Sequence, residues 1–432
     1  MYLILQLLII VLAFIFVERE AISAYAQSYT SAVAPVHKHT DAAKPLYSVR
    51  VSTWPVNVQD SNEYFLIDID APLTWHECIV QWNMHPGSCP SNTRCTSSVS
   101  CEEYECTHVR TSYTYQNPSC PPETNISTTM PGNWIYCTCP VNVVNPVTGS
   151  CDQALLNYDE LNLNTSDGRN VFTGLSGANP NAACAPSSSF ASFPANVTGV
   201  MGFSSSPYAL PFNMYYLLRN TLALCLPSKP SATGVLFFGP GPYYLLPQSN
   251  VDVRSYLSYT PLLKHPDSFG YFISVHSIVI KKRSIDVPAN TTTKLSTIDP
   301  YTTLRTDIYN GVIRRFSMVT KRLRPAEPIA PFSLCYSTST TGLKVPNIDF
   351  SLPDGKKWTV STANSIKQIS SEVACLAFVD GGATSEPAIV IGTFQFEDNF
   401  LLFDLENSTL RFSSSLLRKQ TTCANFNFTL TP

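Results

Sequence analysis

The carboxylate best placed for chemistry in this chain is Asp68, at the end of an apolar run. The residues from Phe65 to Ile69 are apolar apart from Asp68 itself, as is typical of a buried strand. Pro72 follows shortly afterwards and cannot continue a strand ladder. A carboxylate held at such a point can act as a general acid or base if a second proton-sharing group faces it.

A similar phrase returns in the second half of the chain. The stretch from Lys294 to Leu304 again runs from a strand-like entry into a Pro-Tyr turn, with Ser296 near its start. One such phrase in each half predicts two related lobes. A chain of 432 residues is long enough to give each lobe its own core.

The first phrase resembles the D-T-G-S-x-L-x-W-x-x-C segment of plant pepsin-like aspartic proteases. Asp68 falls on the catalytic position, and Leu73, Trp75 and Cys78 match the pattern. Residues 69–71 are Ile, Asp and Ala instead of Thr, Gly and Ser. The glycine that permits a tight turn beside the acid is therefore replaced.

Ser296 stands where the resemblance places the second catalytic aspartate. Pepsin-type hydrolysis needs two carboxylates that share one proton, and serine cannot replace either. Asp70 lies on the same strand as Asp68, and Asp299 precedes Pro300, which disfavours a helical turn there. The sequence therefore predicts no catalytic residues, with Asp68 and Ser296 as vestiges of the catalytic pair. A residual aspartic endopeptidase that uses Asp68 is kept as the third interpretation, after the inhibitor and the storage protein described below.

Further segments extend the resemblance, in the same order, over nearly the whole chain after Tyr47. They lie at 196–211, 225–247, 259–263, 330–336, 375–382, 389–405 and 413–429. Together they resemble the plant pepsin-like proteins without protease activity: TAXI-type xylanase inhibitors, xyloglucan-specific endoglucanase inhibitors, extracellular dermal glycoproteins and basic 7S globulins. This resemblance implies a mostly β, bilobal pepsin-like (aspartic protease) fold.

The resemblance also implies how a partner would be bound. In the inhibitors, loops of the C-terminal lobe set a His or Arg against the two catalytic acids of a glycanase. Such acids lie about 5 to 10 Å apart, and a cation between them gains charge-assisted hydrogen bonds. The matching loops here are 321–331 and 380–387. The candidate partner-binding residues are Lys321, Arg322, Arg324, Thr384, Ser385 and Glu386.

The implied function is therefore a secreted, proteolytically inactive homologue that binds and inhibits microbial cell-wall-degrading endoglycanases. The expected partner is a microbial glycoside hydrolase, either a xylanase or a xyloglucan endoglucanase, and no cofactor or metal is expected. Glu386 in the second loop would repel the acids of such an enzyme. With this departure the chain would bind another hydrolase or would have lost the function, and the alternative to the inhibitor is a 7S-globulin-like extracellular binding or storage protein without a glycanase target.

Composition and the start of the chain indicate an extracellular protein. Only 14% of residues are charged, against about 25% in an average domain, and the net charge of −3 predicts neither nucleic-acid nor anionic-membrane binding. Residues 1–26 are interpreted as a signal peptide, since an apolar run precedes an A-x-A site. We expect a flexible N-terminus at 27–45, an N-terminal lobe at 46–245 and a C-terminal lobe at 246–432. After signal removal no membrane association is expected, and the location is the apoplast or cell wall.

The cysteines and sequons agree with secretion. Fourteen cysteines allow up to seven disulfides in an oxidising compartment, and ten of them lie between Cys78 and Cys184. Zinc binding by this group is disfavoured, because no C-x-x-C pair and no His at finger spacing is present. Six N-x-S/T sequons predict glycosylation: Asn125, Asn164, Asn196, Asn290, Asn407 and Asn427.

Two helices and one basic turn are also predicted. Residues 214–224 read as a short helix of the first lobe, and residues 307–323 as an amphipathic helix with Ile308, Val312, Phe316 and Val319 on one face. The basic run at 281–283 is interpreted as the solvated tip of a hairpin. No clean Tyr-bearing hairpin flap is found, since Tyr113 and Tyr115 lie in a Cys- and Pro-rich setting.

Overall fold

The computed structural model describes residues 30–53, 62–81, 95–112, 120, 127–129, 135–178, 181–213, 219–245, 251–338 and 343–431. The predicted signal peptide, Tyr113, Tyr115 and Asn125 lie outside these residues. No helix within them is both long and apolar enough to cross a membrane.

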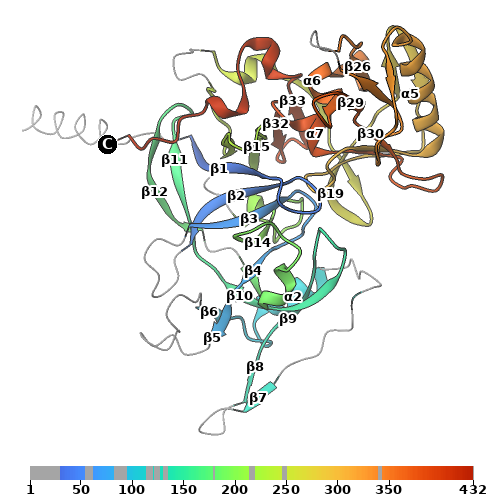
Figure 1. The fold of residues 1–432 in the computed structure, drawn as a ribbon. Helices are drawn as coiled ribbons and strands as arrows, with labels where there is room; N and C mark the ends of the chain where they lie inside the picture. The colour runs from blue at the N-terminus through green and yellow to red at the C-terminus, as the bar shows by residue number, and fades with distance from the viewer. Residues whose placement is uncertain are drawn as a thin grey trace, which may run out of the picture.

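A sheet of seventeen strands forms the centre of the described chain (Figure 1). Its strands are β1 (Ser31–His39), β2 (Leu46–Thr53), β3 (Asn62–Asp68), β4 (Thr74–Glu77), β5 (Ile79–Gln81), β6 (Cys95–Ser98), β9 (Pro140–Val144), β10 (Cys151–Tyr158), β11 (Leu161–Ser166), β12 (Val171–Ala178), β13 (Asn181–Ala185), β14 (Val197–Gly202), β15 (Thr221–Cys225), β16 (Gly234–Phe238), β17 (Ser258–Pro261), β32 (Phe400–Asp404) and β33 (Thr409–Phe412). A separate hairpin joins β7 (Ser127–Thr129) to β8 (Ile135–Cys137). The helices among these strands are α2 (Tyr104–Ser112), α3 (Leu210–Asn213) and the 3₁₀ turn Ser187–Phe190.

Three smaller sheets and one long helix make up most of the C-terminal half. The first contains β18 (Leu263–His265), β19 (Ser268–Ile273), β22 (Thr293–Leu295), β23 (Thr302–Leu304), β30 (Phe378–Asp380) and β31 (Ile389–Ile391). The second contains β20 (Ser277–Ile280), β21 (Arg283–Asp286), β26 (Ile348–Ser351) and β27 (Lys357–Val360), and the third β24 (Pro325–Ala326), β25 (Cys335–Ser337), β28 (Ile366–Gln368) and β29 (Val373–Leu376). The helices here are α5 (Thr306–Val319), α6 (Thr362–Ser365), α7 (Thr393–Phe396) and the 3₁₀ turns Val253–Tyr256, Pro353–Gly355, Leu416–Lys419 and Cys423–Asn425.

Strand β1 corrects the expectation of a flexible N-terminus at 27–45. It pairs with β2, β11 and β16, so residues 31–39 are built into the central sheet. Ala32, Ala34 and Val36 are buried. Their small side chains give a weak hydrophobic pattern, which explains why the sequence alone did not indicate a strand.

The central sheet also crosses between the two halves of the chain. Strand β15 pairs with β32, and β17 pairs with β33. Strands β17, β32 and β33 all lie beyond residue 245, where we placed the lobe boundary. The C-terminal segment therefore returns to the sheet that the N-terminal half begins.

Of the two predicted helices, one is confirmed and one is partly wrong. Helix α5 buries Ile308, Val312 and Phe316, as its apolar face predicted, but it ends at Val319, which is half-buried, four residues before the predicted end. Residues 221–224, expected at the end of a helix, belong to strand β15, in which every residue is buried. Residues 214–218 of the predicted helix lie outside the described residues. A short run that is apolar on every side fits a strand buried on both faces as well as a helix.

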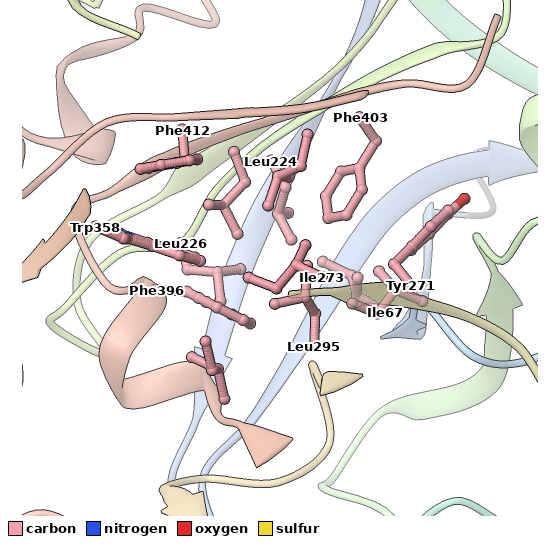
Figure 2. Close-up of a cluster of buried hydrophobic side chains, with 14 of the residues drawn as sticks. Ile67, Leu224, Leu226, Tyr271, Ile273, Leu295, Trp358, Phe396, Phe403 and Phe412 are labelled. Atoms are coloured by element: carbon pink, nitrogen blue, oxygen red, sulfur yellow. The ribbon is translucent and has the colours of Figure 1, made fainter. Parts of the chain in front are cut away.

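The largest hydrophobic core joins both halves of the chain. Figure 2 shows Ile67 and Leu224 of the first half beside Tyr271, Ile273 and Leu295 of the second. Trp358 stacks on Phe412, with 4.8 Å between ring centroids. Burial of this kind stabilises by roughly 1.5–3 kcal/mol for each large side chain, so the two halves are expected to depend on each other for stability.

Disulfides, not metal sites, account for the described cysteines. The six bridges between described residues are Cys78–Cys184, Cys101–Cys137, Cys106–Cys139, Cys120–Cys151, Cys225–Cys423 and Cys335–Cys375. Cys95 is disulfide-bonded as well. The prediction of a disulfide framework is confirmed. Cys225–Cys423 ties β15 to the C-terminal end of the chain.

Candidate functional site

Asp68 ends strand β3 beside the parallel strand β14. Its backbone carbonyl accepts a hydrogen bond from the Phe203 N–H (2.8 Å), and its Oδ1 accepts one from the Asp70 N–H (2.8 Å). The residue is only 7% exposed. Burial, followed by the nearby charge of Asp70, raises the pKa of the Asp68 carboxyl to about 6. Asp68 therefore becomes protonated under mildly acidic conditions.

Ser296 follows strand β22 and uses its hydroxyl to close a turn. Its Oγ accepts hydrogen bonds from the backbone N–H groups of Ile298 (3.2 Å) and Asp299 (3.0 Å). The Ser296 N–H itself donates to the Ile391 carbonyl (3.0 Å). The side chain is buried. These contacts describe a structural role, since a hydroxyl that closes a turn cannot share a proton as a second carboxylate would.

Thr297 brings the two predicted positions together. Its hydroxyl donates to the Ile67 carbonyl (2.6 Å) and accepts from the Ile69 N–H (3.2 Å). Thr297 and Ile67 are 230 positions apart in the sequence, yet this contact places the two residues flanking Asp68 against the neighbour of Ser296. The sequence-predicted pair is therefore adjacent in space, and it contains one carboxylate.

The side chain of Asp70 binds residues of the C-terminal half; only its backbone N–H contacts Asp68. Its Oδ2 forms an ion pair with Lys294 (2.5 Å), and its Oδ1 accepts a hydrogen bond from the Ser268 hydroxyl (2.8 Å). A Cβ added to Gly270 would lie 2.4 Å from Asp70 Oδ1, so glycine is needed for this approach. Sequence reasoning missed Lys294, although it precedes Ser296 by two positions much as Asp70 follows Asp68.

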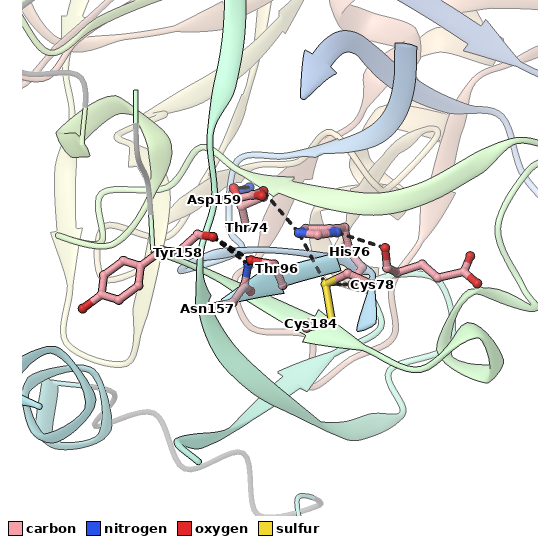
Figure 3. Close-up of polar contacts among 10 residues, drawn as sticks. Thr74, His76, Cys78, Thr96, Asn157, Tyr158, Asp159 and Cys184 are labelled. Carbon is pink, nitrogen blue, oxygen red and sulfur yellow. Dashed lines mark hydrogen bonds and ion pairs between the residues drawn. A yellow bond between two sulfur atoms is a disulfide. The ribbon is translucent and has the colours of Figure 1, made fainter. Parts of the chain in front are cut away.

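A buried polar cluster lies near the disulfide Cys78–Cys184, as Figure 3 shows. His76 Nε2 lies 3.2 Å from Asp159 Oδ2 and 3.7 Å from Cys78 Sγ, and Nδ1 lies 3.1 Å from the Glu77 carbonyl. The His76 side chain is fully buried and that of Asp159 nearly so. Because the Cys78 sulfur is bonded to Cys184, the cluster is not a nucleophilic triad.

The first predicted partner-binding loop, 321–331, follows helix α5. Lys321, Arg322 and Arg324 are all exposed, and none of them forms an ion pair with the described part of the chain. Thr320, at the start of the loop, is held by a hydrogen bond between its hydroxyl and that of Tyr336 (2.6 Å). Lys321, Arg322 and Arg324 are thus exposed cations that follow a residue held in place by a side-chain hydrogen bond.

The second loop, 380–387, differs from the sequence expectation in its charge. Glu386 is paired with Arg305 (3.0 Å), which also binds Asp307 (2.9 Å). The loop is fixed at Asp380, whose Oδ1 accepts from the Thr306 hydroxyl (2.7 Å). The acid that would repel a glycanase therefore has a cation beside it. Sequence reasoning missed Arg305, because it lies 81 positions from Glu386.

The remaining two candidates of this loop present polar groups. Thr384 is exposed and Ser385 is half-buried. The Ser385 hydroxyl donates to the Pro387 carbonyl at 3.4 Å. Neither carries charge, so the loop's electrostatic character is set by Glu386 and Arg305.

The structure does not gather the two loops at one point. Loop 380–387 contacts the start of α5, whereas Lys321 and Arg322 follow its end. A helix of 14 residues is about 21 Å long. The cations of the first loop and the Glu386–Arg305 pair are therefore expected to lie about one helix length apart.

Five of the predicted sequons fall on described residues, and all five are exposed: Asn164, Asn196, Asn290, Asn407 and Asn427. The side-chain oxygen of Asn427 accepts from the Thr429 hydroxyl of its own sequon (2.8 Å). The side-chain amide of Asn407 donates to both carboxylate oxygens of Asp404 (3.0 Å each). Use of Asn407 would have to rearrange these bonds; glycosylation at all six sequons stays a prediction.

Comparison with known families matches both halves of the chain. The model described as xylanase inhibitor N-terminal matches residues 53–240, and the model described as xylanase inhibitor C-terminal matches residues 270–414. Together they cover more than half of the chain.

Curated relatives carry several different names. Chitinase CLP from Oryza sativa subsp. japonica is 35% identical over 408 residues, which is 90% of each chain. Gamma conglutin 1 from Prunus dulcis is 38% identical over 67% of this chain and 70% of the relative. Probable aspartic proteinase GIP2 from Nicotiana benthamiana is 35% identical over 68% of this chain and 73% of the relative.

Solved structures confirm the pepsin-like fold. The crystal structure of edgp superposes with a TM-score of 0.77 at 29% identity, covering 93% of this chain and 99% of that chain. Conglutin gamma from lupine seeds gives a TM-score of 0.75 at 26% identity, covering 94% of this chain and 100% of that chain. Both the expected fold class and the resemblance that predicted it are confirmed.

Proposed function

Because the chain belongs to the family of aspartic-protease-like proteins with xylanase inhibitor N-terminal and C-terminal domains, we propose that it inhibits a microbial cell-wall-degrading endoglycanase. We further propose that the chain is secreted to the apoplast and has no peptidase activity. The observation that carries the proposal is a set of three exposed cations after the end of α5, none of which forms an ion pair with a described residue: Lys321, Arg322 and Arg324.

The absence of peptidase activity follows from proton chemistry. A pepsin-type site requires one carboxylate as base and one as acid. Here Ser296, at the position expected for the second carboxylate, uses its hydroxyl to close a turn, and the Asp70 side chain is held by Lys294. Neither residue offers Asp68 a shared proton, so we expect no hydrolysis of peptides at acidic pH.

Inhibition would rest on charge complementarity. A glycanase site holds two carboxylates about 5 to 10 Å apart, and a guanidinium placed between them makes paired, charge-assisted hydrogen bonds. Arg322 and Arg324 can supply such a group without first breaking an ion pair of their own. Arg305 would have to leave Asp307 or Glu386, so we assign the contact to the first loop.

The test is a titration of the purified protein against fungal xylanases and xyloglucan-specific endoglucanases, following residual enzyme activity. We expect dose-dependent loss of activity with at least one enzyme. The variants Arg322→Ala and Arg324→Ala should each weaken inhibition by about tenfold or more, as truncation of one partner of a buried charge pair costs roughly 2–5 kcal/mol. Lys264→Ala removes an exposed cation elsewhere and should leave inhibition unchanged.

The alternative is a 7S-globulin-like extracellular binding or storage protein. Its support is the likeness to the lupine conglutin gamma structure. No inhibition of any enzyme in the panel would favour this alternative. If inhibition is unchanged in both Arg322→Ala and Arg324→Ala, the chain is still an inhibitor, but loop 321–331 is not the part that contacts the enzyme.

Hydrolysis by the chain itself is measured in the same preparations. Peptide substrates at acidic pH test the residual aspartic endopeptidase, and chitin is included because the rice relative is named a chitinase. We expect no turnover of either. Turnover that disappears in Asp68→Asn would contradict the proposal that this chain is not an enzyme.

A further inference from the structure

A basic hairpin tip lies beside the outer helix of the C-terminal half. Strands β20 and β21 are joined at Lys281 and Lys282, and Arg283 begins β21. All three residues are exposed. Figure 1 shows α5 at the outer edge of this half.

Arg315 of α5 fastens the tip to the helix. Its guanidinium donates to the carbonyls of Ile280 (3.2 Å) and Lys281 (3.1 Å). Further along the same contact, Gly311 approaches Ile285 so closely that an added Cβ would lie 2.8 Å from Ile285 Cγ2. The hairpin is therefore packed against the helix, and Arg314, the residue before Arg315 in the chain, is exposed as well. We call Lys281, Lys282, Arg283, Arg314 and Arg315 the basic tip.

The charge of this region contrasts with that of the whole chain. Residues 277–324 contain ten Lys or Arg and three Asp, a net charge of +7, whereas the full chain carries −3. Five of these cations form the basic tip and three belong to loop 321–331; the other two, Lys294 and Arg305, are paired with acids. Within the described residues, Lys281, Lys282, Arg283 and Arg314 form no ion pair with an acid. These four exposed cations are thus available to an external anion, whereas Arg315 is engaged with backbone carbonyls.

The backbone of the tip is not one that lysine favours. Lys281 and Lys282 have φ of 48° and 66°, in the left-handed region that few non-glycine residues adopt. Two-residue hairpin turns of this kind prefer Asn-Gly or Asp-Gly. Backbone strain of this sort concentrates at functional sites, and here it occurs at two exposed cations in the turn of the hairpin.

The residue types at the basic tip fit some classes of partner better than others. The core of a protein interface is apolar or aromatic, with Arg and Met enriched and Lys depleted. The basic tip contains no apolar residue, and the one large exposed apolar side chain among the described residues of α5 is Met318. Single-stranded nucleic acid needs aromatic stacking, and a membrane-bound helix needs a broad apolar face. The basic tip offers neither. A hydrated, flexible polyanion that needs only spaced cations fits it better.

We propose that the basic tip binds a carboxylated polysaccharide, a linear polyuronate whose sugar carboxylates pair with Lys281, Lys282, Arg283 and Arg314. Arg315 positions the hairpin against α5. The contacts are exposed charge pairs, so binding depends on several of them acting together and weakens as salt screens them. This site is independent of the endoglycanase contact proposed for the first loop.

The test measures binding of the full chain to polygalacturonate by interferometry at 50 and 200 mM NaCl. We expect binding at low salt that weakens roughly tenfold at the higher salt, in the manner of multivalent ion pairing. The fully methyl-esterified polymer should not bind. Equal affinity for the esterified polymer, or equal binding of DNA of matched charge, would overturn the proposal.

The decisive variant is Lys281→Asn combined with Lys282→Gly. It places the preferred Asn-Gly pair in the turn, so the protein should fold at least as stably while binding falls about tenfold or more. Lys229→Gln with Lys264→Gln removes two exposed cations elsewhere and should retain binding. Unchanged affinity of the Asn-Gly variant would reject the basic tip as the site.

Discussion

The Asp68 carboxylate is deeply buried and is hydrogen-bonded by the backbone N–H groups of Asp70 and Ala71. Its Oδ1 accepts from the Asp70 N–H, and the nearest cation, Lys294, is already bound to Asp70. Burial raises the pKa of the Asp68 carboxyl from 3.8 to about 6. A shift of this size corresponds to about 3 kcal/mol. Ionising the Asp68 carboxyl therefore costs free energy in the folded state, where the protonated form is favoured.

The pH dependence of stability should reveal this cost. Between about pH 4 and 6 the folded state keeps a proton that the unfolded state has lost, so the contribution of Asp68 to stability falls as pH rises. Asp68→Asn keeps an oxygen for the Asp70 N–H but carries no charge. We expect the variant to be more stable than the wild type by about 1–3 kcal/mol at pH 7 and nearly equal at pH 4.

Urea denaturation with disulfides intact measures this difference at each pH. Asp267→Asn, at an exposed carboxylate, is the matched control and should show a small difference from wild type at both values. A gap between Asp68→Asn and wild type that stays constant from pH 4 to 7 would contradict the role of burial in raising this pKa.

At the scale of elements, α5 is the part of the C-terminal half that both predicted loops depend on. Its buried face packs Ile308, Val312 and Phe316 into the core. Its start fixes loop 380–387 through Thr306, and its end leads into loop 321–331. Loss of packing under the helix should therefore disturb both loops.

Substitutions on the two faces of α5 test this packing. Phe316 is fully buried, and Phe316→Ala should lower the free energy of unfolding by about 3–5 kcal/mol through lost burial and a cavity. Met318 lies two positions away but is 51% exposed. Met318→Ala should change stability by less than about 0.5 kcal/mol. Similar costs for the two variants, measured by urea denaturation, would show that the helix is not anchored by this face.

At the scale of the whole molecule, two ion pairs of different burial join the halves. Lys38 of β1 binds Glu397 (2.7 Å), and the Tyr47 hydroxyl donates to the same Glu397 oxygen (2.8 Å). Lys38 and Glu397 are 3% and 8% exposed. Burial raises the pKa of Glu397, and Lys38 opposes this rise. The Asp70–Lys294 pair is 37% and 23% exposed, so solvent screens it.

Removal of one lysine from each pair should separate their contributions. Lys38→Met leaves Glu397 buried without its cation and should cost about 3–5 kcal/mol. Lys294→Met breaks a partly exposed pair and should cost about 1 kcal/mol or less. Thermal or urea denaturation measures both. A larger loss for Lys294→Met would mean that the solvent-screened pair, and not the buried one, holds the halves together.

The sequence by itself determined the features that depend on local pattern. The phrase around Asp68, the amphipathic face of α5 and the disulfide framework were all predicted correctly, and the resemblance of many ordered motifs identified the pepsin-like fold. Each of these rests on spacing within a few residues or on residue type, which the chain displays directly. The assignment of Ser296 to the position of a second catalytic aspartate came from the same resemblance and stays a prediction.

Only the tertiary structure decided which groups meet. The Thr297–Ile67 contact, the Lys294–Asp70 pair and the Arg305–Glu386 pair join residues far apart in sequence, and no local period encodes such partners. The same holds for β1 and β15, since a weak or uniformly apolar run becomes a strand only when neighbours accept its hydrogen bonds. The charge of the second loop, and the length of α5 between the two loops, followed from how the chain folds back on itself.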